Sequence, residues 1–535
     1  MSKLTISPLG GVGQIGSNAT LISYEETNII IDAGILFPSE DCFDINYLIP
    51  DLSDVKLKIS NIIISHGHED HIGAISHYIE KFPEAQIHAP KFAKELIEDK
   101  LNYLDLSKKI HRLDDTLIID KIEINAVHVN HSIPNTKGLH LGIKEIDTGI
   151  LFISDFKSDF NCPYEGPIDL EQMKSLARKY TNRISMLDST NITSSTLRTT
   201  SESELKSDLS KFIKDAPGRV FITCFASNIH RIQTIFDIAK EQNLKVITYG
   251  RSLLKYTRIA SECEIFDDHG LIREVESVQD LSKKQIIICS GSQGEFRGTV
   301  KRISSGNDKF FKVNEKDTFI FSSKAIPGNE KKLAFLYNEL TSSGAEVITS
   351  ANGLIHASGH PGKEDLKDVY EAYLPTIAIP IHGETYFIRK HIEFLNTILP
   401  KSKALEIANR DVVTIFANGE VKLNKTEEVP PILIHGNRIE IEREKISERR
   451  KMATLGSVFV SIANNSIKKA SGRVHITALG IPYEEDQLNQ LKELCFSIYQ
   501  EKGTLDQRSE KIRIATRRYF QNILGYRPLA IVHIC

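Results

Sequence analysis

Apolar positions in the first 155 residues fall into short runs separated by turn residues. The runs at 61–64 and 150–154 are rich in isoleucine and are bounded by serine, glycine or aspartate, a pattern typical of β-strands. Helical spacing of apolar positions interrupts the strands at 71–82 and 91–104. The first part of the chain is therefore predicted to be rich in strands, with helices between them.

From about residue 190 the pattern changes to a regular alternation. A helix is predicted at 201–216, a strand at 218–225, a helix at 227–243 and a strand at 244–250. Such alternation is typical of βαβ units around a parallel sheet. After about residue 355 we expect a helix, a strand and another helix, then a charged helical linker at 439–456 and a small β/α unit.

Composition and charge are those of an ordinary globular protein. Of the 535 residues, 41% are hydrophobic and 26% are charged, and the formal net charge of −3 excludes a uniformly basic nucleic-acid binder but not a local basic channel. No apolar run approaches the roughly 20 residues of a membrane helix, and the first residues have no signal core. The seven cysteines are scattered and never in CxxC spacing, which argues against disulfides and a cysteine zinc site. We therefore expect a cytoplasmic protein without membrane contact.

The segment 11–16 matches the glycine pattern GxGxxG and follows a predicted strand. A dinucleotide site requires a helix next, so that the helix N-terminus faces the pyrophosphate. Residues 18–24 instead have the pattern of a strand. We interpret the glycines as a tight turn between two strands.

The sequence SHGHEDH at 65–71 is the strongest chemical signal. His66, His68, Asp70 and His71 follow an apolar strand and precede a helix. A loop at a strand end can aim the first two histidines at one point, and the helix start can aim the other two residues at a neighbouring point. Neutral imidazoles and carboxylates suit zinc or manganese. With only 18 histidines in the chain, chance is a poor explanation, and we predict a metal site.

This cluster alone cannot fill two metal sites, so further ligands are expected from distant sequence. Three candidates stand at the ends of predicted strands: His131, Asp155 and His382. Each alone would more often be a structural residue. Their joint fit to a two-metal site is what makes them candidates.

The order HxHxDH, a later histidine, an aspartate after a strand and a final histidine resembles the metallo-β-lactamase fold. The segment between Asp155 and His382 resembles the β-CASP insert of nucleic-acid-processing members. Five finer motifs resemble bacterial ribonuclease J, and they occur in order along the chain: FASNIHR (225–231), GSQGE (291–295), IPGNE (326–330), HASGH (356–360) and PIHGE (380–384).

The resemblance implies an α/β fold: a metallo-β-lactamase αββα sandwich with an inserted β-CASP α/β domain and a small C-terminal β/α domain. It places the first part of the metallo-β-lactamase domain at 1–200 and the β-CASP domain at 201–355. The second part of the metallo-β-lactamase domain is expected at 356–435, a linker at 436–455 and the C-terminal domain at 456–535.

The resemblance also implies two divalent metal ions, zinc first, with manganese or magnesium as alternatives. One ion would be bound by His66, His68 and His131, the other by Asp70, His71 and His382, with Asp155 bridging them. Asp32, after the run 29–31, would orient the histidine loop. Asp188, His360 and His382 match the three β-CASP motifs.

The expected chemistry follows from such a site. A water between two cations about 3.5–4 Å apart loses a proton near neutral pH, and the bridging hydroxide would attack a phosphodiester in line. We count Asp70, Asp188 and His360 as catalytic. His360 would protonate the leaving 3′-oxygen, with Asp188 holding it protonated, and the products would carry 5′-phosphates. The alternative for His360 is a phosphate-holding role without proton transfer.

Small residues in turns let backbone N–H groups approach an anion. In ribonuclease J such loops form a pocket for the 5′-monophosphate of RNA, and the alternative for each loop is ordinary turn chemistry. The candidates for RNA and 5′-phosphate binding are Ser227, Asn228, Arg231, Ser290, Gly291, Ser292, Ser322, Ser323, His356, Ala357, Ser358, Gly359 and His360.

We therefore expect a 5′→3′ exoribonuclease that prefers 5′-monophosphorylated RNA, has some endonuclease activity, and acts in mRNA decay and rRNA processing. A DNA-directed β-CASP nuclease is the alternative. A small-substrate hydrolase fits the large insert poorly, and a scaffold with a dead site would be expected to lack ligands.

The resemblance implies a homodimer or homotetramer, and a helicase or another nuclease as partners in RNA degradation. The C-terminal domain would support dimer formation, or extend the RNA path through Lys468, Lys469 and Arg473. Phe296 and Arg297 stand where the family usually has proline and a small or apolar residue, so the family's loop shape is not implied here, and Arg297 is a further candidate phosphate contact.

Overall fold

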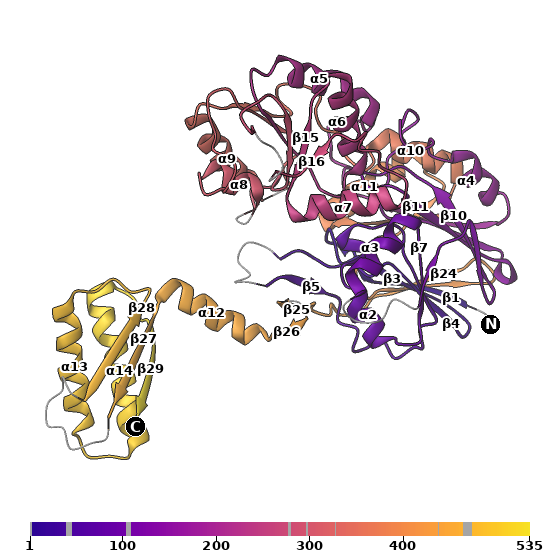
Figure 1. The fold of residues 1–535 in the computed structure, drawn as a ribbon. Helices are drawn as coiled ribbons and strands as arrows, with labels where there is room; N and C mark the ends of the chain where they lie inside the picture. Colours follow the sequence, from indigo (N-terminus) through magenta and orange to yellow (C-terminus); the bar gives the residue numbers. More distant parts are fainter. Residues whose placement is uncertain are drawn as a thin grey trace. The chain divides into compact units, whose positions relative to one another are not determined.

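The computed structural model describes residues 3–38, 45–102, 109–275, 280–295, 298–326, 328–436, 438–463 and 473–535. The chain forms two compact units (Figure 1). One comprises Met1–Leu36 and Ile49–Pro431, and the other comprises Phe37–Leu48 and Ile432–Cys535.

Two large sheets form the centre of the first unit. The eight-stranded sheet has the order β24 (Val421–Asn424), β23 (Val412–Phe416), β1 (Lys3–Gly10), β3 (Ala19–Tyr24), β4 (Thr27–Ile31), β6 (Asn61–Ile63), β7 (Gln86–Ala89) and β8 (Ile110–Arg112). The seven-stranded sheet has the order β22 (Lys403–Ala404), β20 (Ile377–Ile381), β13 (Asn182–Asp188), β12 (Thr148–Ile153), β11 (Lys137–Ile143), β10 (Ile122–His128) and β9 (Thr116–Ile119).

The two sheets face each other across one apolar core. Ile6 and Ile22 of the first sheet cluster with Ile124, Leu139 and Met186 of the second, and all five are fully buried. Both sheets also carry helices on their outer faces. These helices are α1 (Glu69–Ile72), α2 (Ile75–Lys81) and α3 (Lys91–Leu101) on the first sheet, and α4 (Leu170–Ala177), α10 (Lys363–Tyr373) and α11 (Thr385–Ile398) on the second. The αββα arrangement confirms the predicted fold class.

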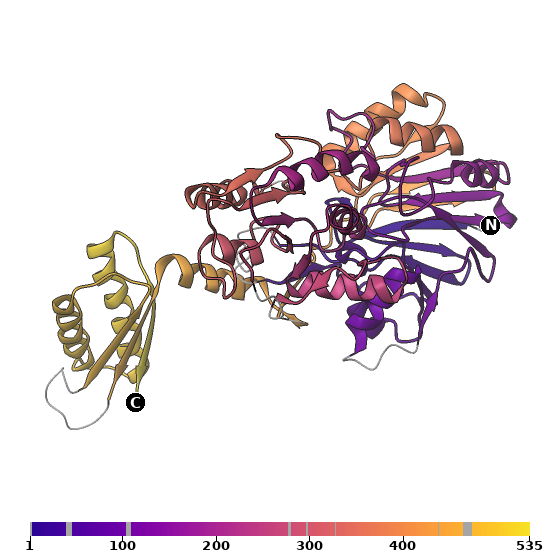
Figure 2. The same ribbon diagram turned by 45° about the horizontal axis from the view of Figure 1, so that its top comes forward.

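An inserted segment builds a third sheet (Figure 2). Its strands have the order β16 (Ile272–Arg273), β15 (Val246–Tyr249), β17 (Ile286–Cys289), β14 (Val220–Thr223), β18 (Thr318–Phe321) and β19 (Glu346–Ile348), and they pair in parallel. Every residue of β14, β17 and β18 is buried, as expected of a parallel sheet covered on both faces. The accompanying helices are α5 (Glu202–Asp215), α6 (Ile229–Glu241), α7 (Arg251–Glu262), α8 (Thr299–Ser304) and α9 (Glu330–Ser342).

The insert leaves the seven-stranded sheet after β13 and returns to it at β20. These two strands pair in parallel, with Asp188 opposite Ile381. The carboxyl ends of parallel strands meet at one edge of a sheet. Asp188 and His382, which are far apart in sequence, therefore come together at that edge.

The glycine segment forms no dinucleotide site. Strand β2 (Val12–Gly13) and then β3 follow β1, so no helix stands after the glycines. Gly11, Gly13 and Gly16 have positive φ angles of 85°, 78° and 115°, which favour glycine. The interpretation as a turn between strands is confirmed. β2 pairs with β21 (Gly383–Glu384), and the Gly11 carbonyl accepts a hydrogen bond from the backbone N–H of His382.

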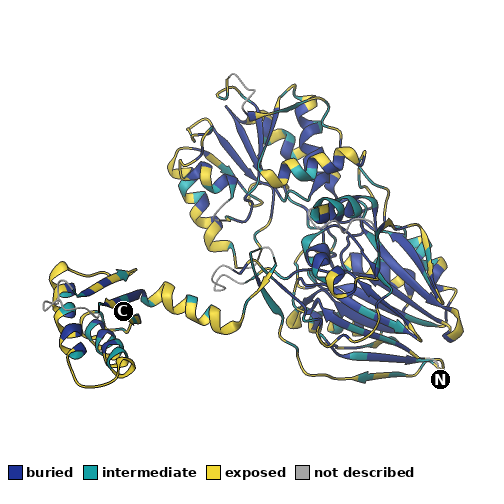
Figure 3. Cartoon of the chain, turned by 60° about the horizontal axis from the view of Figure 1, so that its bottom comes forward, coloured by how far each residue is buried: buried dark blue, intermediate teal, exposed yellow. Residues whose placement is uncertain are grey.

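In the part of the second unit that the structure describes, there are two small sheets and three helices. β25 (Ile432–His435), β26 (Ile439–Glu440) and β5 (Tyr47–Ile49) form one sheet, and β27 (Ser457–Ile462), β28 (Val474–Leu479) and β29 (Leu529–Ile534) form the other. Helices α13 (Glu485–Tyr499) and α14 (Leu505–Leu524) share a core with the second sheet. Helix α12 (Arg443–Leu455) has no buried residue and is exposed along its length (Figure 3).

Lys468 and Lys469, two candidates for an RNA path, lie outside the described residues. The guanidinium of Arg473 stands 5.4 Å from the centre of the Tyr499 ring. Among the residues that the structure describes, no helix is both long and apolar enough to span a membrane.

Candidate metal centre

The histidine loop begins where β6 ends and continues into α1. His66 and His71 are completely buried. Asp32 follows β4, the parallel neighbour of β6, and has a left-handed backbone with φ of 64°. Such a conformation is costly for a residue with a side chain and is typical of functional sites. It brings the Asp32 carboxylate under the loop, where it accepts hydrogen bonds from the backbone N–H and the hydroxyl of Ser65 at 2.8 and 2.9 Å.

One group of ligand atoms comes from His66, His68, His131 and Asp155. Nδ1 of His68 lies 3.2 Å from Nε2 of His66 and 3.1 Å from Nε2 of His131. Oδ2 of Asp155 lies 3.5 Å from Nε2 of His131. The ligand atoms of all four residues lie within 4.8 Å of one another.

A second group comes from Asp70, His71 and His382. Nε2 of His71 lies 3.5 Å from Oδ2 of Asp70, and Nε2 of His382 lies 3.9 Å from the same oxygen. Asp155 reaches this group too, because its Oδ1 is 3.1 Å from His71 Nε2 and its Oδ2 is 3.6 Å from His382 Nε2. The structure thus brings together all seven predicted ligands, with Asp155 between the two groups.

Hydrogen bonds hold the ring orientation of four of these histidines. Nδ1–H donates to the Asp32 carboxylate from His71 (2.8 Å), to the Gly359 carbonyl from His131 (2.6 Å) and to the Asn18 amide oxygen from His382 (2.8 Å). The Ser65 hydroxyl donates to Asp32, so it accepts from Nδ1 of His66 at 2.9 Å. With the proton on Nδ1, the neutral form of each of these four rings presents the lone pair of Nε2 to the centre.

Of these orienting groups, sequence reasoning expected only Asp32. Asn18 and Ser65 were missed, although Asn18 stands two residues after the glycine segment and Ser65 directly precedes His66. The Asn18 amide also donates to the carbonyl and carboxylate of Asp70 at 3.2 and 3.4 Å. Asn18, together with the Gly11 carbonyl that accepts from the backbone N–H of His382, therefore supports the second ligand group.

The charges and lone pairs of the site fit metal ions. Within the described residues, the buried Nε2 of His382 and Oδ1 of Asp155 have no hydrogen-bond partner. Burial, together with neighbouring histidines, holds the pKa of His66 well below its usual value and that of His68 at about 4, so these rings are neutral. Although burial opposes it, the carboxylates of Asp155, Asp70 and Asp32 raise the pKa of His71. Lone pairs in contact and surplus negative charge are conditions that divalent cations relieve.

His360 and Asp188 stand beside the two ligand groups. Nδ1 of His360 bonds Oδ2 of Asp188 at 2.8 Å and lies 3.6 Å from Oδ2 of Asp155. Burial alone would lower the pKa of His360, but the carboxylates of Asp188 and Asp155 outweigh it and raise that pKa to about 9. The carbonyl of His360 accepts from Thr199 and Asn191 at 2.7 and 3.1 Å, which fixes its loop.

The candidate phosphate-binding loops lie at the carboxyl edge of the six-stranded sheet. Ser290 to Ser292 follow β17, and Ser322 and Ser323 follow β18. Gly291 has a φ of 108°, and the Ser323 hydroxyl donates to the Ser292 carbonyl at 3.3 Å. Ser227 follows β14 by a few residues, and the segment 356–360 leads from this edge to His360. Phe296 and Arg297 lie outside the described residues.

Arg231 has partners other than a ligand. Its side chain is fully buried; it pairs with Glu202 and donates to the Ser322 hydroxyl at 2.5 Å and to the Ile355 carbonyl at 3.0 Å. Asn228 caps α6 by accepting from the Arg231 backbone N–H at 3.0 Å. Arg231 thus connects α6 to the loops after β18 and β19, and Asn228 fixes the start of α6.

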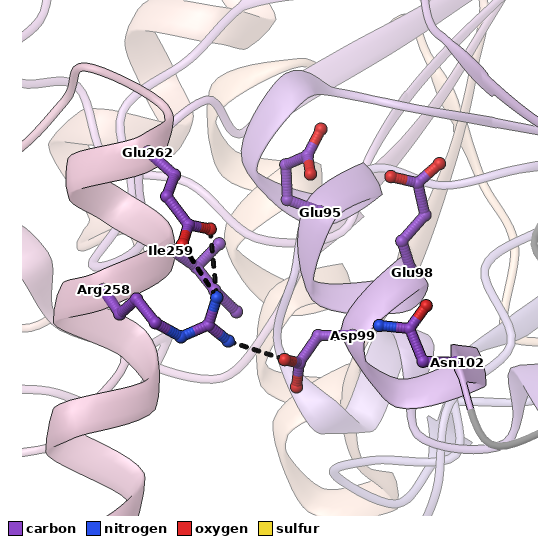
Figure 4. A pocket seen from close by; sticks show the side chains of 7 residues that line it. All are labelled: Glu95, Glu98, Asp99, Asn102, Arg258, Ile259 and Glu262. Carbon is purple, nitrogen blue, oxygen red and sulfur yellow. Dashed lines mark hydrogen bonds and ion pairs between the residues drawn. The ribbon is translucent and has the colours of Figure 1, made fainter.

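A polar cavity of about 370 Å³ lies between α3 and α7 (Figure 4). Arg258 crosses it to Asp99 at 2.7 Å and also pairs with Glu262 on its own helix at 2.9 Å. The remaining lining is Glu95, Glu98, Asn102 and Ile259. None of the predicted ligands lines this cavity.

Two facing sheets with a histidine and aspartate centre at their edge define a metal-dependent hydrolase of the metallo-β-lactamase superfamily, and the model of that superfamily matches residues 12–156. The family model for the ribonuclease J beta-CASP domain matches residues 217–340. Ribonuclease J 1 of Streptococcus pyogenes is 31% identical over 85% of this chain and 82% of its own length. The chain belongs to the ribonuclease J family and is a metal-dependent nuclease.

Two further likenesses agree with this assignment. Ribonuclease J of Sinorhizobium meliloti is 28% identical over 99% of this chain and 97% of its own length. A crystal structure of a protein of unknown function from Enterococcus faecalis V583 matches with a TM-score of 0.55 and 14% identity over 77% of this chain and all of that one, which supports the fold alone.

Proposed function

We propose that this protein is a 5′→3′ exoribonuclease that degrades 5′-monophosphorylated RNA and also cuts internally. The observation that carries the proposal is the pair of ligand groups that share Asp155, with the His360–Asp188 pair 3.6 Å from the same carboxylate. Such a site serves phosphodiester hydrolysis, and the names of the relatives point to RNA. We further propose that the metal is zinc, with manganese or magnesium as substitutes.

The proposed roles of the residues follow from their contacts. His66, His68 and His131 would bind one ion, Asp70, His71 and His382 the other, and Asp155 both. Bound divalent cations lower the pKa of water and offset the negative charge that grows on the phosphoryl oxygens.

His360 would be the proton donor for the leaving 3′-oxygen. Its Nδ1 is engaged by Asp188 at 2.8 Å, so Nε2 is the nitrogen left to carry the transferred proton. The side chain of His360 is 24% exposed, so it can meet a substrate, whereas the Asp188 side chain is fully buried. Asp188 would keep the ring oriented and charged.

The 5′-phosphate pocket would be formed by backbone N–H groups of the turns at 290–292 and 322–323 and of the segment 356–360. Arg231 would support the turn at 322–323 and the start of the segment 356–360 through its bonds to Ser322 and Ile355, and Asn228 would hold the start of the helix that carries Arg231. A pocket at a fixed distance from the metal centre would let the enzyme remove one nucleotide per cut. We also propose a cytoplasmic location, a homodimer or homotetramer, and a place in RNA-degrading assemblies.

One RNA with a 3′ label, prepared with a 5′-monophosphate, a 5′-triphosphate or a 5′-hydroxyl, tests the proposal. Each form is incubated with manganese or zinc, beside single-stranded DNA of the same sequence. Conversion of the monophosphorylated RNA to mononucleotides is the expected result, and a His68→Ala, Asp70→Ala protein should lack it. If internal fragments form whatever the 5′ end carries, the 5′-phosphate pocket is wrong. If DNA is cleaved faster than RNA, DNA is the substrate.

A further inference from the structure

A buried chain of side chains lies directly behind the proposed proton donor. His391 in α11 is completely buried, and its two ring nitrogens have different partners. Nδ1 lies 3.0 Å from the hydroxyl of Ser189, and Nε2 lies 2.9 Å from the phenol oxygen of Tyr370 in α10. Ser189 and Tyr370 are also completely buried. The three residues form one hydrogen-bonded chain from α10 through α11 to the end of β13.

These hydrogen bonds join the three segments that carry Asp188, His360 and His382. Tyr370 belongs to the helix that begins just after His360, and His391 belongs to the helix that begins just after His382. Ser189 is the next residue after Asp188. Along the chain, these three segments are separated by at least a whole helix or by the β-CASP insert. The hydrogen bonds of His391 therefore link them directly.

The loop after β13 is tied at both ends. The backbone N–H of Ser189 and the hydroxyl of Thr190 donate to the His382 carbonyl at 3.3 and 3.0 Å. The backbone N–H of Thr190 donates to Oδ1 of Asp188 at 2.8 Å, which leaves Oδ2 for His360. Packing is equally close here, because a Cβ on Gly383 would stand 3.0 Å from Cβ of Ser189. A movement of Ser189 would therefore move the carboxylate that holds His360.

The chemistry of His391 suits a fixed support and not a reacting group. It contacts hydroxyls on both sides, and burial lowers its pKa to about 3, so the ring is neutral. A neutral imidazole has one donor and one acceptor, and a hydroxyl can fill either role. The chain is thus satisfied without any charge in the apolar interior.

We propose that His391 is a positioning residue that, through Ser189, sets the place of Asp188 and thereby of His360. This inference rests on the proposed role of His360 as the proton donor. Misplacement of a catalytic group by about 1 Å can cost roughly a hundredfold in rate. Because the chain reaches the donor side of the site, its loss should affect the protonation of the leaving group more than the attack on phosphorus.

The test compares two substrates on full-length protein loaded with manganese. RNA with a 5′-monophosphate needs a proton on its leaving 3′-oxygen, whereas bis(p-nitrophenyl) phosphate releases a stable p-nitrophenolate that needs none. The variants Ser189→Ala and His391→Leu should lower kcat on RNA by roughly 10- to 100-fold at unchanged KM, and should keep most of their activity on the activated diester. His391→Asn, which can still reach Ser189, should recover part of the loss, and Tyr370→Phe should have a smaller effect.

A control and a reference variant complete the design. Tyr249→Phe also removes a phenol hydroxyl, one that bonds Asp308 at 3.0 Å in the six-stranded sheet, and should leave the ratio of the two activities unchanged. His360→Ala should lose activity on RNA but not on the diester. If His360→Ala loses both equally, the proton-donor role is wrong and the inference falls with it. If only His360→Ala shows the selective loss, the inference about His391 alone is wrong.

A variant can lose activity because it does not fold or does not bind metal. Measurements of thermal unfolding and of metal content identify such a variant. If His391→Leu does not fold, Ser189→Ala and Tyr370→Phe decide the question, since each removes a single oxygen. Wild-type kcat on RNA in both would overturn the proposal, and so would equal losses on both substrates in a folded, metal-loaded variant.

Discussion

The metal centre and the loops at the edge of the six-stranded sheet use their polar side chains in opposite ways. In the metal centre, orienting bonds occupy one side of four histidine rings, and atoms such as His382 Nε2 and Asp155 Oδ1 are left facing inward. In the loops, the polar side chains of Arg231 and Ser322 bond to other parts of the protein. The first region is built to bind through side chains, whereas in the second the Arg231 and Ser322 side chains already have protein partners and only the buried Nδ1 of His356 has none among the described residues.

The strongest test of this difference is Asp155→Asn, which keeps the shape but removes the charge shared by both ligand groups. We expect nuclease activity to fall by at least about 10³-fold, with loss of bound metal measured by atomic emission after dialysis. Chelation of the wild type should have the same effect, and added manganese should reverse it in the wild type but not in the variant. Full metal content in the variant would show that the side chains do not bind the ions as assigned.

The second test displaces a ligand ring without replacing the ligand itself. A Cβ on Gly359 would stand 2.6 Å from Cε1 of His131 and 2.7 Å from its Nδ1, so Gly359→Ala should displace that ring. We expect a loss of roughly 10- to 100-fold in metal affinity, measured by titration with a competing chelator. Gly166→Ala is the matched control, because nothing lies within 4 Å of a Cβ there. Equal affinities in the two variants would count against the role of the Gly359 carbonyl.

The third test asks whether Arg231 supports the loops or binds a ligand. Removal of one member of a buried ion pair is costly, so Arg231→Met should lower the free energy of unfolding by about 3–5 kcal/mol. Arg258→Met, which breaks half-exposed ion pairs, should cost about 0–1 kcal/mol. Urea unfolding of the metal-loaded proteins measures both. A stable Arg231→Met protein that no longer prefers 5′-monophosphorylated RNA would move Arg231 from support to binding.

The smallest expected effect is on the free energy of unfolding at acid pH. Burial opposes ionisation of Glu202, but the Arg231 guanidinium outweighs it and lowers the pKa of that carboxyl. A carboxyl with a lowered folded-state pKa stabilises the fold above its unfolded pKa, and this contribution is lost as the pH falls through the folded-state pKa. Glu202→Gln should therefore flatten the decline of the free energy of unfolding below about pH 4.5. An unchanged slope would show that the pair does not titrate with unfolding.

The sequence could predict best the part of the site whose residues lie next to each other along the chain. His66 to His71 occupy adjacent positions after a strand, so their convergence follows from local geometry. His131, Asp155 and His382 each stand at the end of a predicted strand, which made them candidates before any distance was known. The resemblance to ribonuclease J assigned them to two groups.

The supporting contacts could not be predicted, because they depend on which strands become neighbours. Asn18 meets His382, and Ser189 meets His391, only because sheets close across long stretches of sequence. Arg231 had the residue type of a phosphate contact, but its partner Glu202 was hidden in a helix assigned on apolar spacing alone. Sequence patterns indicate which chemistry a side chain can perform, whereas the pairing of strands decides which residues it contacts.

Because the ligands of the metal centre come from distant segments, they are synthesised at different times. His382 follows β20, which must pair with β13, and β23 must pair with β1 before the eight-stranded sheet is complete. At about 5–20 residues per second, the ribosome needs roughly 10–50 s to pass from Asp155 to His382. Throughout that interval the growing chain has an incomplete second ligand group while it stands beside ribosomal RNA. The late position of His382 therefore delays the appearance of a working nuclease until nearly all of the first unit has been synthesised.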